Sequence, residues 1–348
     1  YEMTQNVAPW NGSLSSGAAT RSNEGAFITM SYTRGPGYVT DAQAATQAGY
    51  GWNTDTLRTA FRFAMGSEKA QLHTINVQNL AYENNQAGLN LSYMFANNPK
   101  LANVTMDTVA TWGNSNGLNM SYMLFRAGTD ESVIGTGTAT LTNVGSKVDM
   151  YGSTVDVRRS SSNANLTYML SGAAGFHTIT LNGVGAGENA NLSYFADGAA
   201  AATTINAKAV GCGANVTMRA AFRGTGGTQG PDGKDNLYIG SRTSASITLD
   251  HVAVNGGSIE DMLSETFTAK GLTGSKTISL NASKVGSARG AELSSAASLL
   301  HGSAATQADL RGMADVNGTM ANALAGMTNI GSIKMSDASL SGSMVALA

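Results

Sequence analysis

Apolar residues recur along most of the chain with one spacing, apolar-x-x-apolar-x-apolar-x-x-apolar. Clear copies begin at Leu72, Leu101 and Phe176, and weaker copies continue as far as Ile330. The two central apolar residues of each copy are two positions apart, which is the period of a strand with one buried side. Self-similarity at intervals of about 25 to 42 residues is typical of proteins built from stacked repeats. The pattern therefore predicts a series of short parallel strands that line one core.

One polar residue separates the two central apolar residues of each copy. Seven of nine such residues are Thr, Ser or Asn. Because successive side chains of a strand point to opposite sides, these residues are expected to face away from the core as an uncharged polar ladder. We take six of them as candidate binding residues: Asn76, Thr105, Thr140, Thr180, Asn206 and Thr248. The ladder continues with Ser279, Asp309 and Lys334.

A second motif precedes many of the strands. The segment Asn90–Phe95, with the sequence NLSYMF, returns in similar form at Asn119, Asn165 and Asn191. A polar residue followed by apolar residues at positions i, i+3 and i+4 is typical of a short capped helical turn. Each repeat is therefore predicted to be a helical turn, a bend and a short strand, with the Tyr-Met pairs of the motif filling the core. Blurred earlier copies of the motif are Ile28–Tyr32 and Leu57–Phe61.

The combination of these two motifs resembles the BspA-type leucine-rich-repeat family. The segments that carry the resemblance are Asn90–Val109, Asn119–Leu124 and Asn165–Val184. The resemblance implies a leucine-rich-repeat-like solenoid of about nine or ten coils, in which short parallel strands alternate with short helical turns. It also implies display outside a cell or on a virus particle, a role in adhesion or ligand binding, and no catalytic residues.

The repeats also predict how the chain is organised. Residues 1–26 lack the repeat and are expected to form an N-terminal arm or cap, and residues 27–348 to form a single continuous solenoid. Insertions are expected near residues 32–52, 145–164 and 223–241. The second of these contains a candidate extra turn or hairpin, and the third has the composition of a turn-rich loop.

Composition limits the classes of partner. Only 13% of the 348 residues are charged and the net charge is −2, so no basic excess is available to bind a phosphate backbone. No apolar run approaches the roughly 20 residues that cross a bilayer. The chain begins at Tyr1 instead of Met, which fits a processed and exported product. We therefore expect an extracellular, cell-surface or virion-surface location, without nucleic acid and without a membrane span.

The residues that most often bind metals do not converge in the sequence pattern. His73 and His177 occupy the same repeat position but lie three strands apart, roughly 14 Å at the usual strand spacing, which is too far for one metal ion. The segment Asp232–Asp235 lacks the alternating carboxylates and the final Glu of an EF-hand loop. No catalytic, cofactor-binding or metal-binding residue is predicted.

Other candidate groups have structural interpretations. Cys212 cannot form an intramolecular disulfide and is expected to be buried. The asparagines of the second motif fall in Asn-x-Ser/Thr triplets, but their fixed place in the repeat favours a capping or turn role over glycosylation. Trp10, Trp52 and Trp112 are either buried at repeat edges or platforms for a sugar ring.

The preferred function is a non-enzymatic extracellular surface or structural protein that acts in adhesion, ligand display or self-assembly. Its partners would be other protein subunits, in a homo-oligomer or filament, or a surface glycan or protein ligand. The alternative is a phage virion protein such as a fibre or decoration protein, and a polysaccharide-active enzyme ranks below both. An ice-binding face would need unbroken threonine columns, and the ladder is interrupted at residues such as Asn76 and Asn206.

Overall fold

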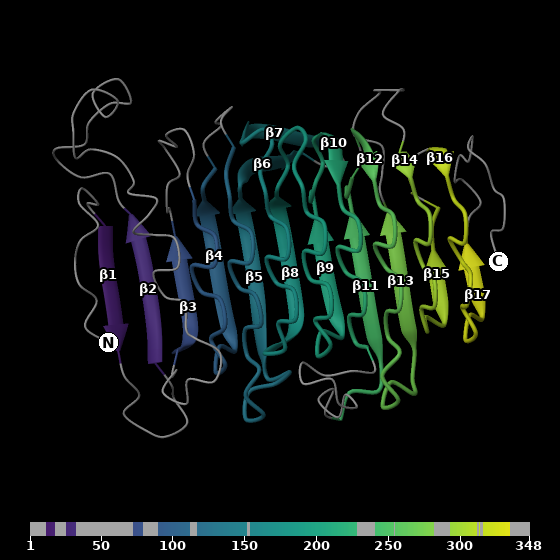
Figure 1. Cartoon of the computed structure of the whole chain (residues 1–348), viewed down its shortest axis with the longest axis horizontal. Helices are drawn as coiled ribbons and strands as arrows, with labels where there is room; N and C mark the ends of the chain where they lie inside the picture. Colours follow the sequence, from purple (N-terminus) through teal and green to yellow (C-terminus); the bar gives the residue numbers. More distant parts are fainter. Residues whose placement is uncertain are drawn as a thin grey trace.

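One large and mostly parallel β-sheet runs the length of the molecule (Figure 1). The computed structural model describes residues 12–17, 26–32, 72–78, 90–111, 117–151, 154–227, 241–253, 255–281, 293–311, 313 and 316–334. The eleven strands of this main sheet are β1 (Gly12–Gly17), β2 (Ala26–Tyr32), β3 (Leu72–Gln78), β4 (Asn103–Val109), β5 (Gly137–Val144), β8 (Phe176–Val184), β9 (Thr204–Lys208), β11 (Ala245–Asp250), β13 (Lys276–Asn281), β15 (Gln307–Asp309) and β17 (Ser332–Lys334). Every neighbouring pair is parallel except β1 and β2.

Two smaller sheets accompany the main sheet. A parallel small sheet consists of β10 (Ala214–Thr217), β12 (Asn255–Ser258), β14 (Leu293–Ser295) and β16 (Val316–Thr319). The strands β6 (Ser146–Tyr151) and β7 (Thr154–Ser160) pair with each other antiparallel. Of the extra turn or hairpin expected within residues 145–164, the structure contains a hairpin, and this pair is called the hairpin below.

The predicted strands and their inward positions are confirmed. Ile179 of β8 pairs with Ile205 of β9, and Leu181 pairs with Ala207. All four side chains are buried, while the residues between them face outward. Removing a Leu or Ile side chain from water contributes roughly 1.5–3 kcal/mol, so alternation over many strands is a strong determinant of register.

Turn segments connect the rest of each repeat, and they bond to one another in a ladder. The backbone N–H of Leu91 donates to the carbonyl of Asn119 at 2.7 Å, and that of Tyr93 donates to Ser121 at 3.1 Å. The next N–H along the chain, that of Met94, instead bonds within its own segment: it donates to the carbonyl of Leu91 at 3.3 Å and closes a four-residue turn. The same alternation continues from repeat to repeat. We call this array the turn ladder.

The predicted leucine-rich-repeat-like solenoid with short helical turns is wrong. The described residues contain no helix, and the motif segments are turns beside large parallel sheets. A right-handed helix needs a negative φ, whereas Tyr93 has φ 59°. The equivalent residues Tyr122, Tyr168 and Tyr194 also have positive φ, at 58°, 56° and 58°. Two successive turns bury positions i, i+3 and i+4 just as a helical turn would, which is why the sequence pattern misleads.

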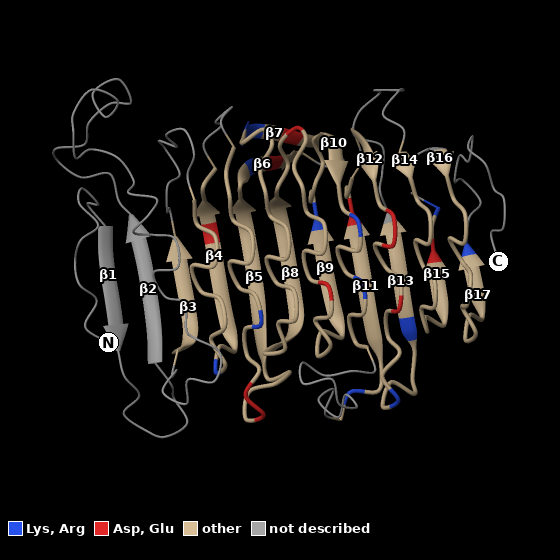
Figure 2. Ribbon diagram, viewed as in Figure 1, with Lys and Arg blue, Asp and Glu red and all other residues tan. Residues whose placement is uncertain are grey.

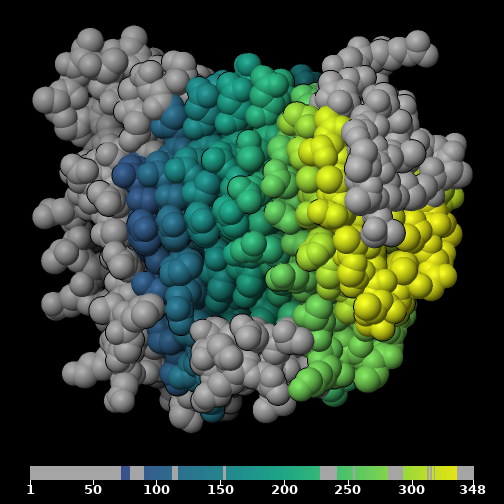
Figure 3. Space-filling view, turned by 45° about the vertical axis from the view of Figure 1, so that its right-hand side comes forward, coloured from purple at the N-terminus to yellow at the C-terminus, as the bar shows by residue number. Residues whose placement is uncertain are grey.

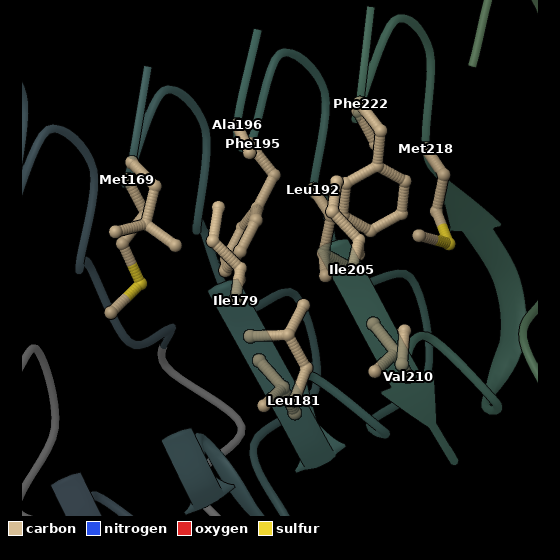
Figure 4. Packing of buried hydrophobic residues seen from close by; sticks show 14 of the residues in the cluster. Met169, Ile179, Leu181, Leu192, Phe195, Ala196, Ile205, Val210, Met218 and Phe222 are labelled. Carbon is tan, nitrogen blue, oxygen red and sulfur yellow. The ribbon is translucent and has the colours of Figure 1, made fainter. Parts of the chain in front are cut away.

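The core lies between the main sheet and the turn ladder. In Figure 4, Ile179 and Leu181 on β8 and Ile205 on β9 lie in one cluster with Leu192 and Phe195 of the turn segments. These side chains belong to one buried cluster that extends from Leu72 to Ala323. Successive repeats occupy adjacent bands of the molecular surface (Figure 3). Each repeat therefore covers apolar surface of its neighbours.

The remaining expectations fall partly outside the described residues. Ile28–Tyr32, expected to be a blurred turn motif, instead lies in β2 of the main sheet. Most of the arm at residues 1–26, nearly all of the insertion at 32–52 and most of that at 223–241 lie outside the described residues. The same holds for Leu57–Phe61, Asp232–Asp235, Trp10, Trp52 and Trp112.

Candidate binding face

The six predicted binding residues form one continuous column across the main sheet. Asn76 pairs with Thr105, Thr105 with Thr140, and Thr140 with Thr180. The column continues through Asn206 and Thr248 to Ser279, Asp309 and Lys334. The side chains are exposed or half-buried, on the side opposite the core. We call this the first column.

A second column, which the sequence reasoning missed, runs beside the first. It lies two residues earlier on each strand, and therefore on the same side of the sheet. Its members on β3, β4, β5, β8, β9, β11 and β13 are Thr74, Asn103, Thr138, Thr178, Thr204, Ser246 and Thr277. All seven are Thr, Ser or Asn. The two columns on these seven strands are called the outer polar face.

The threonine hydroxyls of the first column are free to bind a ligand. In the described part of the chain, the hydroxyls of Thr105, Thr140, Thr180 and Thr248 take part in no hydrogen bond. Threonines at turns behave differently, because the hydroxyl of Thr225 donates to the carbonyl of Phe222 at 3.0 Å. Since β-branched side chains have few rotamers within a strand, the face presents free hydroxyls on a rigid support.

Charged residues lie at the rim of the outer polar face (Figure 2). Asp107, Lys208 and Asp250 stand two residues beyond the first column, on β4, β9 and β11. At the C-terminal end, the guanidinium of Arg311 donates two hydrogen bonds to Asp309 and its backbone N–H donates a third, which lowers the pKa of that carboxyl to about 2. The interior of the face is uncharged over seven strands.

The two histidines of equal repeat position lie apart, as predicted. His73 is on β3 and His177 on β8, with β4 and β5 between them. Each histidine is skipped in the pairing of its strand with the preceding strand of the sheet, where the register shifts by one residue. Burial lowers the pKa of both side chains, and the charge of Arg242 lowers that of His177 further. Among the described residues, no three His, Cys, Asp or Glu side chains are grouped to bind a metal ion.

Cys212 is buried, as predicted. The hairpin packs over it, because Val148 and Val155 share an apolar cluster with Cys212, Ala186 and Ala209. Burial raises the pKa of the Cys212 thiol to about 12. At neutral pH the side chain is therefore a protonated thiol, which is a poor nucleophile.

The asparagines of the turn motif hold the turns, which confirms the turn role. The Oδ1 atom of Asn90 accepts a hydrogen bond from the backbone N–H of Ser92 at 3.0 Å. Asn119 accepts from Ser121 in the same way, also at 3.0 Å. Asn165 and Asn191 repeat the arrangement. A side chain that mimics a backbone turn explains why asparagine recurs at this position.

The tyrosines of the turn motif form a stack. The rings of Tyr93, Tyr122, Tyr168 and Tyr194 follow one another with centroids 4.8, 4.9 and 4.8 Å apart. The guanidinium of Arg223 lies 5.4 Å from the Tyr194 ring. The expectation that the Tyr-Met pairs fill the core is correct for methionine and wrong for tyrosine, since the four rings are half-buried.

Comparisons with protein-family models, with curated proteins and with solved structures gave no match. The relationship to the BspA-type family stays a prediction from the motif residues. The described segments include no helix that is long and apolar enough to cross a bilayer.

Proposed function

We propose that this chain is a non-enzymatic extracellular protein of a cell or virion surface, and that it binds a ligand or a neighbouring subunit through the outer polar face. The observation that carries the proposal is the in-register array of free threonine hydroxyls. Thr140 and Thr180 stand opposite each other on β5 and β8, and within the described residues neither hydroxyl has a hydrogen-bond partner. A hydroxyl nucleophile requires a base within hydrogen-bond reach, and the part of the chain that the structure describes gives these hydroxyls none. The array therefore favours binding over catalysis.

The preorganised sheet supports the same proposal. A binding face that is already rigid loses little conformational entropy when a ligand settles on it. Thr105, Thr140 and Thr180 each lie on a strand paired on both sides, so their backbones are held in place. The columns suit a ligand that is itself extended and polar.

A pull-down with the full chain tests the proposal. Insoluble cellulose, insoluble chitin, ice and fixed bacterial cells serve as the surfaces, and sedimentation reports self-association. We expect at least one surface, or self-association, to retain the native chain. Changing Thr140→Lys together with Thr180→Lys should reduce this binding at least tenfold, whereas Thr154→Lys on the exposed hairpin should not. The absence of all binding, or equal binding by the face variant, would refute the proposal.

A further inference from the structure

The two columns of the outer polar face have a composition that limits what can bind there. The seven strands contribute fourteen residues, and all of them are Thr, Ser or Asn. Such side chains offer neither the charge that attracts phosphates or lipid headgroups nor an aromatic ring on which a sugar can stack. What remains is an array of small groups that donate and accept hydrogen bonds. The matching ligand is uncharged and itself presents a repeating array of O–H donors and oxygen acceptors.

The spacing of the columns gives the face a two-dimensional repeat. Parallel strands lie about 4.8 Å apart, and residues two positions apart on a strand lie about 6.6 Å apart. Both columns stay in register from β3 to β13, and the register shift at His177 on β8 falls just before Thr178, at the edge of the second column. In the view of Figure 1 the strands run in nearly the same direction, so the two columns cross the sheet side by side.

Water in ice has a repeat of similar dimensions. Oxygen atoms joined by O–H···O bonds of about 2.75 Å in a tetrahedral network repeat at about 4.5 Å in one direction and about 7.3 Å in another. The face matches both repeats to within about a tenth. A sheet of hydroxyl and amide groups at these spacings, with the hydroxyls of Thr105, Thr140, Thr180 and Thr248 free, can order water into the positions of the ice lattice before contact with a crystal.

We propose that the outer polar face binds ice, and that the ice lattice is the ligand of the proposed binding face. This inference rests on the proposed function and names the ligand class. Asn and Ser interrupt the threonine columns, but both preserve hydrogen-bonding groups. The charged interruptions, Asp309 and Lys334, fall on β15 and β17, beyond the seven strands of the face.

Thermal hysteresis of the full chain tests this inference. A single ice crystal is held in protein solution, and the gap between its melting and growth temperatures is measured while its shape is observed. We expect the native chain to shape the crystal and to produce a gap that rises with protein concentration. Thr180→Tyr, at the centre of the face, should reduce the gap to that of buffer. A bulky side chain there would hold the flat lattice away from its neighbours.

Two further variants complete the design. Thr154→Tyr places the same side chain on the hairpin, at an exposed strand residue that belongs to neither column, and should keep the native gap. If Thr180→Tyr lowers the melting temperature of the protein, Thr105→Tyr replaces it, because Thr105 is more exposed. Tyrosine is well tolerated in strands.

The outcomes separate the inference from the proposed function. No hysteresis and no crystal shaping by the native chain would overturn the ice inference, as would a native gap in both face variants. If cellulose, chitin, cells or self-association then showed binding sensitive to Thr140→Lys and Thr180→Lys, the binding face would stand with another ligand. If the chain bound none of these surfaces and did not self-associate, both the ice inference and the proposed function would be refuted.

Discussion

The rings of Tyr122 and Tyr168 stack 4.9 Å apart with an interplanar angle of 6°, although the hairpin separates the two residues in the sequence. Their backbones are equivalent, with φ 58° and 56°. The N–H of Tyr122 donates to the carbonyl of Thr167 at 3.0 Å, which fixes the relative height of the two segments. The turn segments before and after the hairpin therefore stay in register with each other, and the ring stack depends on that register.

Tyr122→Ala should lower the free energy of unfolding by about 1.5–4.5 kcal/mol, because it removes three ring contacts, with Tyr93, Phe125 and Tyr168, of about 0.5–1.5 kcal/mol each. Denaturant melts of Tyr122→Ala, Tyr168→Ala and the double variant give the coupling energy. A coupling near zero would contradict the stack. Tyr151→Ala, on the exposed hairpin, is the control with little expected effect.

Two glycines should respond differently to alanine. A Cβ atom at Gly137 would overlap the carbonyl oxygen of Ala102 on the preceding repeat, so Gly137→Ala should cost several kcal/mol or prevent folding. Gly198 has φ +67° with open space around it, so Gly198→Ala should cost only about 1–2 kcal/mol for the left-handed backbone. Thermal melts compare the two. Equal losses would mean that the repeats do not approach each other as closely as Gly137 requires.

Stability should fall as the pH drops below the ordinary histidine pKa of 6.5. Burial lowers the pKa of His73 and His177 in the folded chain, so the unfolded chain binds protons first as the pH falls. The contribution of these neutral side chains is complete above pH 6.5 and is lost as the pH drops toward the lowered folded value.

Melting temperatures between pH 8 and pH 5 check this expectation. The native chain should lose melting temperature on acidification, and His73→Gln with His177→Gln should lose less. His301→Gln, at an exposed turn residue, should follow the native curve. A melting temperature that rises toward pH 5, or an unchanged slope in the double variant, would contradict the expected sign.

The strand half of each repeat could be predicted from the sequence, because its signal is local and physical. Ile179 and Leu181 are apolar with Thr180 between them, and only a strand places them on one side. The register of the first column followed directly, since a slip by one residue would turn Thr180 into the core. The second column carried the same signal in Thr178 but was not recognised.

The turn half could not be predicted because two conformations bury the same positions. Leu91, Met94 and Phe95 are buried here without a helix. The backbone hydrogen bonds that replace those of a helix connect to the next repeat, and a pattern within one segment of the sequence does not show such bonds. Gly172, Gly198 and Gly224 recur four residues after the tyrosine position, each with positive φ. Glycine at a fixed place of a repeat indicates a left-handed backbone there, but the same signal also ends helices, so it does not distinguish the two conformations.

The core and the outer polar face both depend on which side chains of a strand point inward and which point outward. One pair of thermal melts tests this assignment. Ile179→Asp places a charge among buried apolar side chains, whereas Thr180→Asp places the same charge on the outer polar face. We expect Ile179→Asp to cost more than about 3 kcal/mol or to unfold the chain, because an isolated buried carboxylate has no partner. Thr180→Asp should cost under about 1 kcal/mol, and Thr180→Ser less still. Equal losses for the two aspartates would contradict the assignment and, with it, the binding face.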